Sequence, residues 1–142
     1  MCAAFDRIGA VANYWIKTHQ GSFPPVVIHL SDGESTDGSP MGWASRLQRL
    51  HTSDGNLLLF NVSISSAHSE VGLFLARDST LSTSYARDLF AMSSVLPPVM
   101  LDVARSQGLS VERGARGFGF NADVTALATF LNVGTSVGRL VR

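Results

Sequence analysis

Residues 24–38 read Pro-Pro-Val-Val-Ile-His-Leu-Ser-Asp-Gly-Glu-Ser-Thr-Asp-Gly, an apolar segment that runs directly into an acidic loop. Residues 26–30 lack the polar alternation of a half-exposed strand, which predicts a strand covered on both faces, as in a parallel sheet. Open α/β sheets bind their ligands beyond the carboxyl ends of the strands. The segment therefore predicts a buried strand that carries Asp32 to the ligand-binding edge of a sheet.

The flanking sequence predicts helices and strands in alternation. Apolar residues at three- and four-residue intervals predict a helix over residues 2–19. Its expected apolar face comprises Phe5, Ile8, Val11, Ala12, Trp15 and Ile16. No residue that could cap this helix stands before Met1. A second helix is expected over residues 40–51, with Ser39 as its N-cap, and a second continuously apolar strand over residues 56–64.

The rest of the chain is expected to complete the same architecture. Residues 65–83 predict a long loop, residues 85–92 and 98–107 two short helices, and residues 117–120 a third strand. Asp123 is expected to cap a last helix. The expected apolar stripe of this helix is Val124, Leu127, Ala128 and Leu131. The fold class is thus α/β, three-layered, with a mainly parallel sheet and helices on both faces; residues 1–133 form the domain and 134–142 a flexible tail.

Composition excludes several classes of protein. The 142 residues carry 11 basic and 11 acidic side chains, so no net charge attracts nucleic acid or a membrane surface, and none opposes self-association. The first 15 residues contain Asp6 and Arg7 and resemble neither a signal peptide nor a membrane span. Cys2 is the only cysteine, which excludes an intrachain disulfide and favours a reducing compartment, the cytoplasm.

The acidic loop, residues 32–38, contains the candidate metal ligands. Asp32, with Glu34 and Asp37 as further candidates, could bind a hard cation through carboxylate oxygens. The alternative is that aspartate and glycine form turns there, and spacing alone leaves both interpretations open. The four histidines are too scattered for a zinc site, and Ser31 has no predicted histidine partner for serine catalysis.

Five segments carry a resemblance to a known family: the helix expected over residues 2–19 and residues 26–38, 57–66, 89–97 and 114–123. Together they resemble the carboxyl-terminal half of a bacterial von Willebrand factor A (VWA) domain. The resemblance implies a partial VWA or Rossmann-like fold. It also implies that Asp32 is the last aspartate of a metal-ion-dependent adhesion site. The Asp-x-Ser-x-Ser motif and the threonine of that site have no counterpart here, so we expect Mg²⁺ to bind weakly or not at all.

These observations predict a noncatalytic protein-interaction module with an incomplete adhesion site and a protein partner. The first alternative is a truncated remnant or fragment without independent activity, and the second is a metal-dependent hydrolase that uses the acidic loop. In the VWA family, the strand that matches residues 26–30 is flanked by the first strand of the domain, which this sequence does not contain. The resemblance therefore implies an exposed sheet edge through which the chain self-associates.

Overall fold

The computed structural model describes residues 1–64 and 70–137. The helices are α1 (Cys2–Thr18), α2 (Met41–Leu47), α3 (Ser84–Met92), α4 (Pro98–Ser106) and α5 (Val124–Thr135). The strands are β1 (Val26–Ser31), β2 (His51–Thr52), β3 (Gly55–Asn56), β4 (Leu58–Ile64), β5 (Gly72–Leu73) and β6 (Phe118–Ala122). In this part of the chain, no helix has both the length and the apolar character needed to cross a bilayer.

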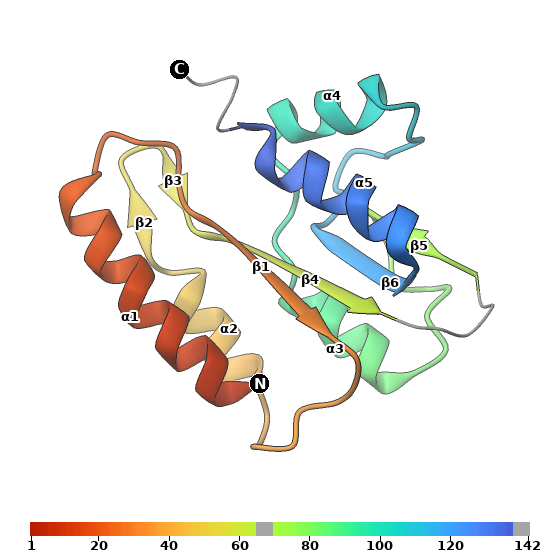
Figure 1. Cartoon of the computed structure of the whole chain (residues 1–142), viewed down its shortest axis with the longest axis horizontal. Coiled ribbons are helices and arrows are strands. Elements are labelled where there is room, and N and C mark those ends of the chain that lie inside the picture. The colour runs from red at the N-terminus through yellow and green to blue at the C-terminus, as the bar shows by residue number, and fades with distance from the viewer. Residues whose placement is uncertain (65–69, 138–142) are drawn as a thin grey trace.

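The main sheet has the strand order β1-β4-β6-β5. Strands β1, β4 and β6 are parallel, and the short β5 pairs antiparallel with β6. Helices α1, α2 and α3 lie on one side of the sheet, and α4 and α5 on the other (Figure 1). The predicted three-layer α/β fold with a mainly parallel sheet is therefore confirmed.

Strand β4 is the centre of the molecule because it separates two apolar cores. Phe60 and Val62 pack with α4 and α5, whereas Leu59 on the opposite face packs with α1, α2 and α3. All three side chains are fully buried. Since successive residues of a strand face opposite sides, burial on both faces requires the continuous apolar run that the sequence shows.

Strand β1 is less buried than we predicted. Its residues are half-buried, and Leu30 is 44% exposed. In the described residues β1 pairs with β4 alone, so it lies at the edge of the sheet. The apolar run still packs on both faces, because Val27 contacts one core and Ile28 the other.

Two of the predicted helical faces are partly wrong. Val11 of α1 and Val124 of α5 are exposed, with fractional exposures of 58% and 85%. Helix α5 is apolar on several sides, and its buried face is shifted from the predicted stripe to Phe130, Val133 and Gly134. The helix also continues through Thr135, beyond the expected start of the tail, and Val137 is buried. Residues 138–142 lie outside the described residues.

Several short elements differ from the prediction. Strands β2 and β3 form an antiparallel hairpin around the turn at residues 53–54, where only a turn was expected. Strand β5 lies inside the predicted long loop, of which residues 65–69 are outside the described residues. Two-residue strands are too short to produce a periodic pattern.

Helix α2 is shorter than the helix predicted over residues 40–51, because it ends at Leu47. Its N-cap is Pro40, which has no side-chain cap, so Ser39 does not cap the helix.

Candidate functional site

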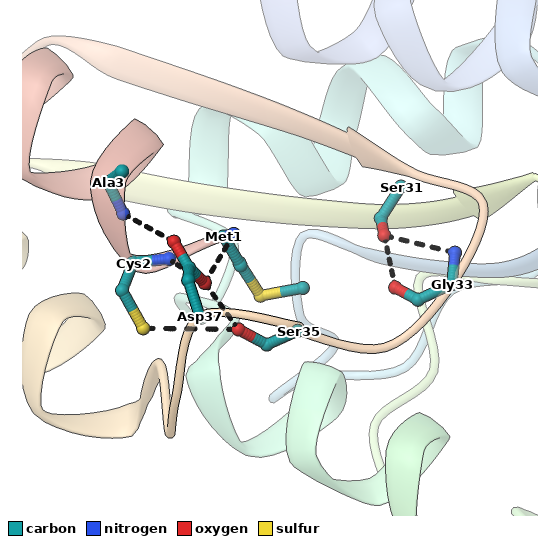
Figure 2. A network of polar contacts seen from close by, with 7 residues as sticks. All are labelled: Met1, Cys2, Ala3, Ser31, Gly33, Ser35 and Asp37. Atoms are coloured by element: carbon teal, nitrogen blue, oxygen red, sulfur yellow. Dashed lines mark hydrogen bonds and ion pairs between the residues drawn. The ribbon is translucent and has the colours of Figure 1, made fainter.

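The candidate site lies where the parallel strands β1 and β4 end at the same edge of the sheet. Ser31, the last residue of β1, holds the start of the acidic loop. Its hydroxyl donates to the carbonyl of Gly33 at 2.5 Å and accepts from the Gly33 amide at 3.3 Å (Figure 2). The hydroxyl of Tyr85 on α3 also donates to Ser31 Oγ, at 3.0 Å. These bonds fix the first turn of the loop.

Asp37 holds the other end of the acidic loop by capping α1. Its Oδ1 accepts from the amide of Cys2 at 2.9 Å, and its Oδ2 accepts from the amide of Ala3 at 2.8 Å. The N-terminal amine and the hydroxyl of Ser35 also donate to Oδ1, at 2.7 and 2.8 Å (Figure 2). The N-cap residue of α1 supplies no side-chain cap. Asp37 therefore satisfies the free amides of a helix that begins 35 residues earlier in the chain than its cap.

The cap depends on the charge of Asp37. The amide of Ala3, the N-terminal amine and the amide of Cys2 all donate to the ionised carboxylate, and they hold the pKa of Asp37 well below its ordinary value. Because the pKa of Asp37 is lower in the folded than in the unfolded chain, the ionised carboxylate stabilises the folded state at pH values above its unfolded pKa of about 3.9. It is lost as the pH falls through the folded pKa.

Replacement of Asp37 by asparagine should lower the urea midpoint of unfolding at pH 7, because the uncharged amide offers only one acceptor oxygen. The difference from the parent protein should shrink as the pH is lowered below about 4, where the aspartate is protonated in the unfolded chain. Urea titrations from pH 7 to pH 2 measure it. Asp32→Asn in the same loop is the control and should leave the midpoint unchanged. Equal midpoints for Asp37→Asn and the parent at pH 7 would show that Asp37 is not a functional cap.

The other two acidic residues of the loop are exposed to solvent. In residues 1–64 and 70–137, no hydrogen bond or ion pair engages the carboxylates of Asp32 and Glu34. Glu34 lines a pocket of about 210 Å³ between the loop and α3, together with Tyr85 and Asp88. The acidic loop thus presents negative charge at the carboxyl end of β1.

The three candidate metal ligands of the loop do not form one cluster in the described residues. The carboxylate of Asp37 is used by α1, and no group of three or more His, Cys, Asp or Glu side chains in the described part of the chain could hold a metal. Magnesium requires nearly octahedral oxygen coordination, and Asp32 and Glu34 are the two carboxylates of the loop that α1 leaves free. The structure therefore separates the three candidate ligands Asp32, Glu34 and Asp37 into two exposed carboxylates and a helix cap.

A chain of polar side chains lies beneath the site and was not identified from the sequence. His29 Nδ1 is 3.1 Å from Asn61 Oδ1, and Asn61 Nδ2 donates to Ser93 Oγ at 3.1 Å. Ser93 Oγ in turn donates to the carbonyl of Leu89 at 2.7 Å. Since the Asn61 amide group donates to Ser93, His29 must carry its proton on Nδ1 to complete the chain. Burial lowers the pKa of His29, which lies edge-on against Phe5.

Comparison of the chain with protein-family models, curated proteins and solved structures finds no match.

Proposed function

We propose that this chain is a noncatalytic protein-interaction module that binds a basic segment of a protein partner through the acidic loop, residues 32–38. The observation that carries the proposal is the pair of exposed carboxylates, Asp32 and Glu34, on a loop that is fixed at both ends by Ser31 and Asp37. A loop held in place by its scaffold loses little conformational entropy on binding. Lysine or arginine side chains are the natural complement of its charge.

The arrangement of the strands supports a relationship to the VWA domain. Parallel strands in the order β1-β4-β6, with β1 at the edge of the described sheet, agree with the resemblance to the carboxyl-terminal half of that domain. Asp32 is the residue that matches the adhesion site of the family. Because the described residues do not assemble a metal site, we propose that the loop contacts its partner directly rather than through Mg²⁺. Weak or absent Mg²⁺ binding stays a prediction.

The hydrogen-bonding of the polar groups near the loop favours binding over catalysis. The Ser31 hydroxyl donates its proton to the carbonyl of Gly33, and among residues 1–64 and 70–137 no histidine or carboxylate accepts a hydrogen bond from it. His29 is held by Asn61 and packed against Phe5. A general base must lie within hydrogen-bonding distance of the group it deprotonates, and His29 makes its described hydrogen bond to an amide instead. We also propose a reducing compartment such as the cytoplasm, since the single cysteine, Cys2, is buried.

Selection of a random peptide library on the immobilised chain tests the proposed function. We expect the enriched peptides to be rich in lysine and arginine and to bind equally well in the presence of EDTA. Binding should be weaker in Asp32→Asn/Glu34→Gln. It should be retained in Asp54→Asn/Glu112→Gln, which removes the same charge from exposed residues outside the loop. Enriched peptides without basic residues, or peptides that bind both double variants equally, would contradict the proposal.

A further inference from the structure

One side of the β1 backbone has no partner in the described part of the chain, because β1 pairs with β4 alone. The amide of Leu58 donates to the carbonyl of Pro25 at 2.9 Å. The Pro25 carbonyl therefore faces β4, and because the backbone groups of successive residues point to opposite sides of a strand, Val27 and His29 also direct theirs toward β4. The backbone groups that point to the open edge belong to Val26, Ile28 and Leu30.

A groove of about 600 Å³ lies beside the start of this edge, lined by residues of α1, of α5 and of the segment before β1. Its largely apolar lining includes Trp15, Phe23, Val26, Ile28, Gly134 and Val137. Val26 and Ile28 face the core that contains α5, and Leu30 shares their face because side chains alternate along a strand. Leu30 is nevertheless 44% exposed. The same edge therefore carries an exposed apolar side chain at one end and an apolar groove at the other.

We propose that β1 pairs antiparallel with β1 of a second copy of this chain, so that the two main sheets join into one continuous sheet. The two-fold axis is perpendicular to the sheet and passes beside Ile28, which lies opposite Ile28 of the second copy. In this register Leu30 of each copy lies opposite Val26 of the other. The exposed leucine of one copy thereby enters the groove of its partner.

The symmetry and the backbone together determine this register. Residues directly opposite each other in an antiparallel pair point to the same face, so a two-fold axis perpendicular to the sheet places one residue opposite itself. With Ile28 at the axis, Val26, Ile28 and Leu30 all occupy hydrogen-bonded pairs of the antiparallel ladder. Each pair exchanges two hydrogen bonds, so the ladder has about six. Pro24 has no amide hydrogen, so the ladder ends at Val26.

Charge favours a second copy as the occupant of the edge. Residues 26–31 carry no acidic or basic side chain other than His29, and the whole chain has a formal net charge of zero, so identical copies do not repel each other. Each Asp32 lies four residues from the axis, which separates the two acidic loops by about 26 Å at about 3.3 Å per residue. The interface runs along β1 and leaves the acidic loop free, so its failure would not affect the proposed function.

Sedimentation velocity of the full chain over a range of micromolar concentrations tests the dimer. We expect the parent protein to sediment as a dimer and Leu30→Pro as a monomer. Proline removes an outward-facing donor and leaves the β1–β4 ladder intact. Leu30→Lys, which puts a charge into the groove, should weaken the dimer at least tenfold. Leu30→Ala is the matched control, because it keeps the amide and should remain partly dimeric. Circular dichroism establishes that each variant is folded.

Hydrogen exchange gives a second measurement that does not depend on a variant. The amides of Val26, Ile28 and Leu30 should become protected as the protein concentration rises, whereas those of Val27 and His29 should be protected at every concentration. A parent protein that stays monomeric would overturn the proposal. So would a dimer that both Leu30→Pro and Leu30→Lys leave intact. Concentration-independent protection of the outward amides would also overturn it, because a segment of the same chain would then cover the edge.

Discussion

Gly117→Ala should destabilise the protein severely. The methyl group of an alanine at this position would overlap the ring of Phe60, at Cδ1, Cγ and Cε1. Phe60 is fully buried on the central strand and packs edge-on against Phe130, so its ring has little room to move. Overpacking a core costs about 1–3 kcal/mol and sometimes more. We expect the upper end of that range, a large part of the 5–15 kcal/mol that stabilises a typical domain.

Urea unfolding of Gly117→Ala measures this loss, with Gly42→Ala as the matched control. A methyl group at Gly42 meets no atom within 4 Å, and Gly42 lies in α2, so alanine there should raise stability by about 0.5–1 kcal/mol. Adding Phe60→Leu to Gly117→Ala should recover part of the loss, since the two positions share one space. An unfolding midpoint of Gly117→Ala equal to that of the parent would show that Phe60 is not packed as described.

Asn61→Leu should also cause a large loss of stability. Asn61 is completely buried and links His29 to Ser93, so leucine leaves the Nδ1–H of His29 without its acceptor and Ser93 without a donor. Each buried polar group left unsatisfied costs about 1–3 kcal/mol. Asn56→Leu, at an exposed position of β3, is the control and should have little effect on stability. Chemical denaturation measures both variants.

The contact between His29 and Asn61 can be separated from general packing by a double-variant cycle. His29→Leu/Asn61→Leu should be less destabilised than the sum of the two single variants, because it leaves no unpaired group between the two positions. Strict additivity would mean that the two side chains do not interact.

The pH dependence of stability gives an independent measure of His29. Burial lowers its folded pKa below the unfolded value of about 6.5, so between the two values the unfolded chain binds more protons than the folded chain. The contribution of neutral His29 to the free energy of unfolding is therefore complete above about pH 6.5, and it falls as the pH is lowered toward the folded pKa of His29. His29→Leu should flatten the stability profile in this window.

The central fold could be predicted from the sequence because its signals are local. The apolar runs at residues 26–30 and 57–60 have no polar alternation, and a strand buried on both faces requires that pattern. The structure confirms both strands and their parallel pairing. The half-burial of β1 could not be predicted in this way, because the same apolar run serves a central strand or an edge strand.

The site was only partly predictable because its contacts join distant parts of the chain. The acidic loop at the end of β1 follows from the sequence, but the separate role of Asp37 depends on its contact with Ala3, 34 residues away. The missing cap of α1 was the available signal, since an uncapped helix start needs a distant acceptor. The bond between His29 and Asn61 depends on strand register, which brings residues 29 and 61 side by side. In α5, too many apolar residues left the buried face ambiguous.

The most direct test of the proposed function is the affinity of one selected basic peptide for the chain, measured by calorimetry at low and at physiological ionic strength. The acidic loop predicts that Asp32→Asn/Glu34→Gln binds the peptide roughly 2- to 30-fold more weakly at low salt, from about 0.2–1 kcal/mol for each exposed pair. The difference should shrink at physiological salt, where exposed charges are screened. Asp54→Asn/Glu112→Gln should bind like the parent. Equal affinities for the parent and Asp32→Asn/Glu34→Gln at low salt would contradict the proposed binding by the acidic loop.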